Sequence, residues 1–392
     1  PIHGSQSCGR AGRFSGRTDG KCLCCHFLFP SAAADGQAYG PPADSFRGDT
    51  CHGCPVACKQ VFQNEDPDPY RRLDPVYGGA EYEAMGAFGS SCGVEDNLAV
   101  LKANELANAY GLDAISTGMS IAFAMECFEN GLLTTADTGG LDYRWGDGAL
   151  LVRSVEMIAG RQGFGDFLAE GVARMAARIG PAAEPFNVTV RRQELPMHEP
   201  RLKPAMGVGY AVAPVGADHQ MNMHDTAYLR PAGMRRVNSA LTEPLPPLAR
   251  AELDENKSVV FYHELNWSHF LDCALICQFY CYDYAQMAEA MSGVTGVEYG
   301  IHDILAIGER LSQIEERLDQ IEDGLLRRDA GQPQILEGAH RARRQAGSRV
   351  AAACDRIGGG HVGIGPVGNV QQGGLSALEE DVPSALAHLI QK

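Results

Sequence analysis

The sequence predicts a mainly α fold, arranged as two helical domains packed around a cofactor cleft. Apolar residues recur at helical spacing in two regions, one before residue 181 and one after residue 247. The stretch between them, 181–247, contains prolines and shows no regular period. Two periodic regions separated by such a break are typical of two domains.

In the first region, each stripe of apolar residues is closed by a glycine, the residue that most often ends a helix. Asp96 or Asn97 is expected to cap a helix that stops at Gly111. The remaining helices are expected to start at Ser116 or Thr117 and end at Asn130-Gly131, to end at Gly160, and to run unbroken from Leu168 to Gly180.

The second region contains a long apolar stripe with alternating three- and four-residue steps. Its members are Ile304, Ile307, Leu311, Ile314, Leu318, Ile321 and Leu325. Such a stripe requires a partner helix. Packing within the chain is one interpretation, and a homodimer contact is the other.

These patterns divide the chain into four parts. We expect a poorly ordered N-terminal segment, 1–47, and a low-complexity tail, 329–392, because both are irregular and rich in glycine and arginine. Between them we expect helical domains at 48–187 and 188–328.

Composition excludes several classes of function. The net charge of −16 and a pI near 5.2 disfavour nucleic acid as a partner, because like charges repel. The sequence has no apolar run of membrane-spanning length and no secretory pattern at its start, so a cytoplasmic protein without membrane contact is expected. Thirteen cysteines in such a protein indicate metal or redox chemistry.

The clearest local signal is Cys51-His-Gly-Cys54-Pro-Val-Ala-Cys58, in which three thiols can converge on one iron–sulfur cluster. The fourth ligand would come from downstream, and spacing alone leaves Cys92, Cys127, Cys273, Cys277, Cys281 and Cys354 open. The alternative is a structural zinc site in which His52 completes the set.

Several motifs occur in one order along residues 48–311. After the cysteine triplet they are Glu81-Tyr-Glu83, Asn108-Ala-Tyr-Gly111-Leu112-Asp113, Glu194-Leu-Pro-Met-His198-Glu-Pro-Arg201, Gly207-Val-Gly-Tyr210, Gly216-Ala-Asp-His219, Asp272-Cys-Ala-Leu-Ile-Cys277 and Ile307-Gly-Glu-Arg310. Together they resemble the aldehyde:ferredoxin oxidoreductases, specifically their C-terminal helical domains 2 and 3. The N-terminal β domain of that family is not recognisable in residues 1–50 and is expected to be missing.

The resemblance implies a tungsten, or molybdenum, bis-pterin cofactor and a [4Fe-4S] cluster. By the family pattern, Asn108, Leu112 and Asp113 contact one pterin, and Asp272 and Ile276 contact the second. Helix capping is the alternative role for either aspartate. The family has an acidic residue where Asn108 stands.

The same pattern makes Cys277 the fourth cluster ligand, beside Cys51, Cys54 and Cys58. Two neighbours of Cys277, Cys273 and Cys281, are expected to be buried small side chains.

The resemblance also implies oxidation of a small aldehyde to a carboxylic acid, with electrons passing to ferredoxin. Glu83 is expected to act as base, and a solvated loop carboxylate is the alternative. His219 is expected to orient the carbonyl or carry a proton, with His198 and His224 as rivals. The alternative function is an iron–sulfur electron-transfer module, or an inactive partial protein that lacks the pterin site.

Overall fold

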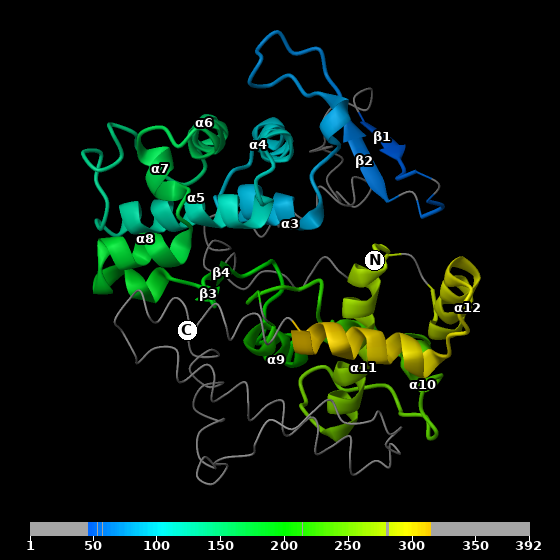
Figure 1. Cartoon of the computed structure of the whole chain (residues 1–392). Helices are drawn as coiled ribbons and strands as arrows, with labels where there is room; N and C mark the ends of the chain where they lie inside the picture. Colours follow the sequence, from blue (N-terminus) through cyan, green and yellow to red (C-terminus); the bar gives the residue numbers. More distant parts are fainter. Residues whose placement is uncertain (1–45, 53, 57, 214, 280–281, 315–392) are drawn as a thin grey trace, which may run out of the picture. The chain divides into compact units, whose positions relative to one another are not determined.

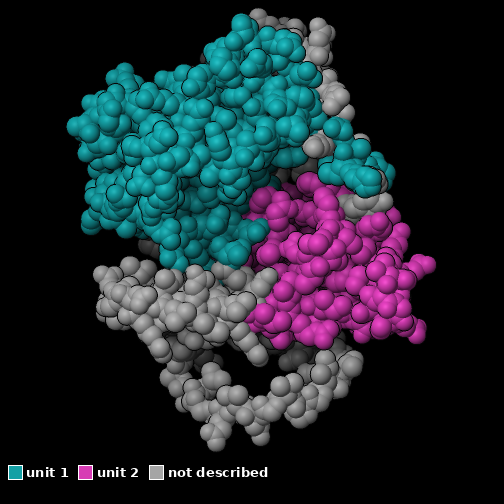
Figure 2. All heavy atoms as spheres, turned by 45° about the horizontal axis from the view of Figure 1, so that its top comes forward, with its two compact units in different colours: residues 1–199, 215–218 teal, residues 200–214, 219–392 magenta. Residues whose placement is uncertain are grey.

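The structure, a computed structural model, describes residues 46–314 except 53, 57, 214 and 280–281 (Figure 1). The chain forms two compact units (Figure 2). Unit 1 comprises the chain up to Glu199 together with the short segment Val215–Asp218. Unit 2 comprises Pro200–Pro214 and the chain from His219 onward. The predicted tail, 329–392, and nearly all of the predicted segment 1–47 lie outside the described residues. The units part at Glu199, beyond the boundary predicted near residue 187.

Most elements of both units are helices, which confirms the mainly α prediction. Unit 1 contains β1 (Phe46–Asp49), β2 (Lys59–Phe62), η3 (Pro75–Tyr77), α3 (Tyr82–Ala84), η4 (Met85–Ser90), α4 (Asn97–Tyr110), α5 (Ala114–Glu129), α6 (Gly148–Ala159), α7 (Phe164–Leu168), α8 (Val172–Ile179), η5 (Pro181–Phe186), β3 (Thr189–Val190) and β4 (Gln193–Glu194). Unit 2 contains α9 (Pro204–Val212), η6 (Asp225–Tyr228), α10 (Pro231–Asn238), α11 (Glu255–Cys273), α12 (Tyr284–Thr295) and a helix whose described part is 301–314.

The core of unit 1 is built on α5, which α4 and α6 both contact while lying side by side (Figure 1). α5 contributes Ile121, Phe123 and Met125, each at most 1% exposed. The helix ends predicted at Asp96 and Gly111 are confirmed: the Asp96 side chain accepts from the amides of Leu98 and Ala99, and Gly111 is left-handed with φ 68°.

Two helix starts in unit 1 were predicted wrongly. α5 is capped by Asp113, whose side chain accepts from the amide of Ser116, so neither Ser116 nor Thr117 is the cap. The single helix expected from Leu168 to Gly180 is two helices, because Gly171 has φ 80° between them. The buried carboxylate of Glu194 then accepts from the first amide of α8, Val172, at 2.7 Å. A tertiary contact therefore caps α8, and no local pattern reveals it.

The cysteine triplet lies in an antiparallel β-hairpin, which the sequence did not predict. β1 pairs with β2 in a register that places Asp49 opposite Lys59, so the intervening loop carries all three cysteines. Both strands have four residues and mix charged with apolar side chains, which leaves little alternation to detect.

In unit 2, two helices lie within the stretch 181–247 that was predicted to be irregular. α9 and α10 begin with Pro204 and Pro231, each in the first helical turn. Proline fits there because the first amides of a helix have no partner within the helix. The prolines were thus interpreted as breaks where they in fact start helices.

α11 packs on α12 and on the helix that begins at Ile301. Their shared core includes Trp267, Phe270, Tyr284, Met287 and Ile304, none more than 3% exposed. The apolar stripe predicted from Ile304 is helical as far as it is described, and it continues beyond residue 314 outside the described residues. Among the described helices, none has the length and apolar character that crossing a bilayer requires.

Candidate functional site

A turn holds Cys51 and Cys54 in the β1–β2 loop. The amide of Cys54 donates to the carbonyl of Cys51 at 3.0 Å, and the hydroxyl of Thr50 lies within hydrogen-bond reach of the carbonyls of both cysteines. The side chains of Cys51 and Cys58 are exposed, and that of Cys54 is partly buried. Three cysteines on one loop fit the donor set of an iron–sulfur cluster.

Cys277 follows the end of α11 in unit 2 and is also an exposed free thiol. The chain reverses there through Leu275, a non-glycine residue with φ 55° and 92% exposure. The amide of Ile276 then donates to the carbonyl of Leu271 at 2.9 Å. Cys273 is exposed, so the expectation that it is buried was wrong, because the helix ends at that residue. Cys281 lies outside the described residues, and the role of Cys277 as fourth ligand stays a prediction.

The residues predicted to contact the first pterin lie at the junction between α4 and α5. The side-chain amide of Asn108 donates to the carbonyl of Tyr77 at 2.9 Å, which ties α4 to η3. Asp113 caps α5 through one carboxylate oxygen, at 2.6 Å from the amide of Ser116. A carboxylate has about four acceptor positions, so capping leaves capacity for a ligand. Asp113 and Asp272 are both exposed, and neither pterin assignment is tested by these contacts.

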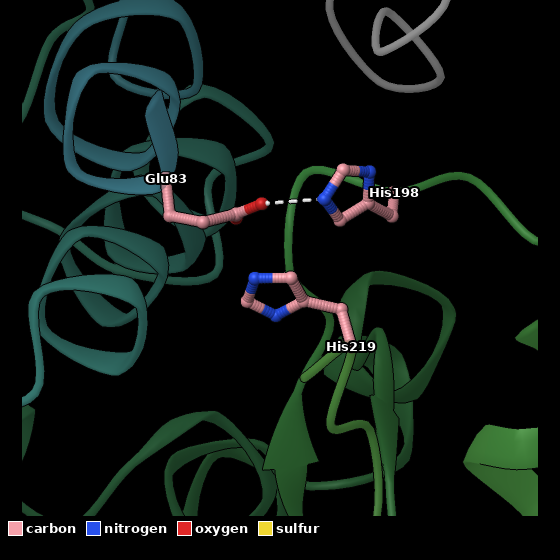
Figure 3. A group of neighbouring side chains, drawn as sticks. All are labelled: Glu83, His198 and His219. Atoms are coloured by element: carbon pink, nitrogen blue, oxygen red, sulfur yellow. Dashed lines mark ion pairs between the residues drawn. The ribbon is translucent and has the colours of Figure 1, made fainter. Parts of the chain in front are cut away.

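Glu83, the predicted base, is held from two sides within unit 1. Its Oε2 accepts from the amide of Met197 at 2.7 Å, and its Oε1 lies 3.1 Å from Nε2 of His198 (Figure 3). The side chains of Glu83 and His198 are only 14% and 16% exposed. The alternative of a solvated loop carboxylate is therefore wrong, because Glu83 lies in α3 and contacts a second segment.

Local packing seats the segment that carries Met197 and His198. The ring of Tyr82 stacks on that of His198, with centroids 5.7 Å apart and planes at 25°. Met197 lies against the backbone of η4, where a Cβ on Gly86 would come within 2.3 Å of its Cγ. η4 is a π-helix, a wide turn often found at functional sites. The glycine leaves room for Met197, and Met197 brings its own amide to Glu83.

His219 follows directly after the segment Val215–Asp218 of unit 1 and is 8% exposed. The side-chain amide of Gln220 donates to its Nε2 at 2.9 Å, so a neutral His219 carries its proton on Nδ1. The rival His224 donates from Nε2 to the carbonyl of His219 at 3.0 Å and accepts at Nδ1 from Lys203 at 3.2 Å. The ring of His224 thus anchors the backbone of His219.

Sequence reasoning kept His198 only as a rival to His219 and missed its pairing with Glu83. The motif Glu194-Leu-Pro-Met-His198 was the available signal. A sequence alone does not show that this segment folds onto α3.

Sequence comparison shows to which family this helical protein, with its cysteine-bearing hairpin loop and its carboxylate–histidine pair, belongs. Residues 31–354 match the family model described as aldehyde ferredoxin oxidoreductase, domains 2 & 3. The chain belongs to this family, which confirms the resemblance and the fold expected from it.

Two curated relatives are named tungsten-containing aldehyde ferredoxin oxidoreductase. The one from Pyrococcus furiosus is 31% identical over 278 residues, and the one from Thermococcus kodakarensis is 32% identical over 276 residues. Each alignment covers 69% of this chain and 42% of the relative, so the chain spans less than half the length of these proteins.

A further relative and a solved structure extend the comparison. The WOR-like subunit of an aliphatic sulfonate oxidoreductase from Pyrococcus furiosus is 30% identical over 178 residues, which cover 43% of this chain and 27% of the relative. The BamBC active-site complex of benzoyl coenzyme A reductase has a similar fold, with a TM-score of 0.54 at 17% identity. That match covers 70% of this chain and 44% of the solved chain.

Proposed function

We propose that the chain supplies domains 2 and 3 of a tungsten-dependent enzyme that oxidises a small aldehyde to a carboxylic acid and passes the electrons to ferredoxin. The observation that carries the proposal is the Glu83 carboxylate, 14% exposed, which accepts from the amide of Met197 and lies 3.1 Å from Nε2 of His198, in a chain of this family. The relatives' names support tungsten, aldehyde and ferredoxin. Balanced, the half-reaction converts one aldehyde and one water into one carboxylic acid, two electrons and two protons.

Residues described above would supply the ligands of the cluster and the contacts to the pterins. Cys51, Cys54 and Cys58, with Cys277, would hold a [4Fe-4S] cluster, since accessible thiols are its ordinary ligands. Asn108, Leu112 and Asp113 would contact one pterin of a tungsten or molybdenum cofactor, and Asp272 and Ile276 would contact the other. When bound, these groups would supply the redox chemistry that takes two electrons from the aldehyde and passes them to ferredoxin.

The chain's own residues supply the proton chemistry. Glu83 takes a proton from the attacking water, and partial burial beside an imidazole suits a carboxylate to that role. His219, neutral with its proton on Nδ1, donates to the carbonyl oxygen of the aldehyde and fixes its orientation. The anchored backbone of His219 limits its movement during the reaction.

Elemental analysis of anaerobically prepared protein tests the cofactors. Tungsten or molybdenum with about four irons per chain is expected for a bis-pterin site and one cubane cluster. Iron without tungsten or molybdenum would indicate an electron-transfer module, and zinc alone would indicate a structural site. Either result contradicts the proposal.

Aldehyde-dependent reduction of a viologen dye tests the activity. Glu83→Gln keeps an acceptor for the amide of Met197 but cannot take a proton, so turnover should fall by roughly 100-fold or more. Metal content should stay unchanged. Undiminished turnover in this variant would show that another group is the base.

A further inference from the structure

The two oxygens of Glu83 have unlike partners. Oε2 accepts from a backbone amide, which cannot titrate, whereas Oε1 faces Nε2 of His198 at 3.1 Å. Imidazole is the side chain most often used to carry protons near neutral pH. One oxygen is therefore fixed in place while the other can pass a proton.

The geometry of the pair is set by its surroundings. Tyr82 and Glu83 are neighbours in α3, and the ring of Tyr82 stacks on His198 while its hydroxyl lies 3.4 Å from the carbonyl of Met197. On the other side of Met197, the Ser91 hydroxyl lies 3.7 Å from its sulfur. These contacts to the backbone and the side chain of Met197 help to hold the imidazole of the next residue 3.1 Å from the carboxylate.

We propose that His198 is a proton-relay residue that takes up the proton which Glu83 removes from water and passes it to solvent. The inference rests on the proposed function. After Glu83 has gained the proton, the O–H bond at Oε1 breaks and an N–H bond forms at Nε2 of His198. The imidazolium then releases one proton to bulk water, which leaves a carboxylate and a neutral imidazole ready for the next turnover. No oxidant beyond ferredoxin is needed, because the relay moves only protons.

His198 is placed to receive the proton from Glu83. Oε1 of Glu83 lies 3.1 Å from Nε2 of His198, and the two side chains are 14% and 16% exposed. Within unit 1, the titratable neighbours of the pair are Tyr82, whose ring stacks on His198, and Glu199, next in the chain.

The substitution His198→Gln distinguishes a role of His198 in proton transfer from a role in holding Glu83 in position. Glutamine can donate a hydrogen bond to Oε1 of Glu83 but cannot carry a proton, so position is kept and transfer is lost. We expect kcat for aldehyde oxidation to fall about 10- to 100-fold with KM changed less than about twofold, and the solvent isotope effect on kcat to rise. Imidazole added to the buffer should restore part of the rate. The matched control is His302→Gln, an exposed histidine in the helix from Ile301, which should behave as wild type.

Two outcomes overturn the relay: an unchanged kcat in His198→Gln, or a lowered kcat that imidazole does not restore and whose isotope effect is unaltered. The second would assign His198 a purely structural role.

A measurement without turnover separates this inference from the proposed function. In a nitrogen-15 histidine titration, Glu83→Gln should lower the midpoint of the His198 ring by about one pH unit, because a nearby carboxylate favours the imidazolium. An unchanged midpoint would overturn the pairing. If wild-type protein oxidises no aldehyde, the proposed function fails, and the titration still decides whether Glu83 and His198 share a proton.

Discussion

Two carboxylates, one in each unit, accept hydrogen bonds from backbone amides. They differ in the basic side chain that lies beside them. In unit 2, Asp225 accepts from the amides of Ala205 and Met206 and lies 2.9 Å from Nζ of Lys257, with side-chain exposures of 0% and 2%. In unit 1, Glu83 accepts from one amide and faces an imidazole, at 14% exposure.

The difference between these pairs separates structure from chemistry. The Asp225–Lys257 pair is fully buried, and its carboxylate also caps the start of α9 by accepting from two amides there. The partner of Glu83 is an imidazole, the side chain most often used to carry protons near neutral pH. The Glu83–His198 pair is also partly exposed, whereas the Asp225–Lys257 pair is not.

The largest effect should come from breaking the fixed pair. Lys257→Met leaves the Asp225 carboxylate buried without its counter-charge, which should lower the free energy of unfolding by about 3–5 kcal/mol. Denaturant unfolding followed by circular dichroism measures this. The control is Arg144→Met, which removes an exposed pair with Asp142 and should change stability by less than about 0.5 kcal/mol. Similar losses in both variants would show that the buried pair has no special role.

Asp113 offers an intermediate case, a carboxylate with a structural contact and a predicted ligand role. Asp113→Ala removes the cap of α5 and should cost about 1 kcal/mol of stability, whereas Asp113→Asn should cost little because asparagine also caps helices. If Asp113 also binds a pterin, the asparagine variant should contain less pterin than wild type, measured by fluorescence after acid release. Full pterin content in the stable asparagine variant would limit Asp113 to capping.

The smallest effect concerns His263, whose burial outweighs the opposing influence of the adjacent Glu264 carboxylate on its pKa. Burial lowers the pKa of His263 below its ordinary value of 6.5, with its ring packed between Tyr262 and Tyr284. The unfolded chain therefore binds a proton that the folded chain does not, and stability should decline as the pH falls below about 6.5. His263→Gln should flatten this decline by a few tenths of a kcal/mol, seen by comparing thermal unfolding at pH 5.5 and pH 7.5. A decline of equal slope in the variant would exclude His263 as its source.

Patterns local to the chain predicted much of the fold, and the failures have two causes: contacts between distant segments, and local signals that can be interpreted in two ways. Asp96 and Gly111 were predicted correctly because a cap and a left-handed glycine act on adjacent residues. The division between α7 and α8 was missed because its cap, Glu194, comes from another part of the chain. Pro204 and Pro231 misled because proline ends one helix and begins another with equal ease.

The candidate site, too, was predicted from the sequence only in part. Motif order selected Glu83 and the cysteine loop as candidates, since both depend on residues close in sequence. The partnership of Glu83 with His198 depends on how the segment around Met197 packs against α3 and η4. That packing depends on side-chain geometry, which the periodicity of the sequence does not encode.

Gly86 has a consequence for comparing this chain with others of its family. An alanine there would press its methyl group into Met197, 2.3 Å from Cγ, and displace the two consecutive residues that contact Glu83. One uncharged substitution would thus alter proton exchange at the site without removing any acid or base. Glycine at this position, together with the Met-His dipeptide, is a two-part sequence signature by which homologues with the same carboxylate–imidazole arrangement can be sorted from those without it.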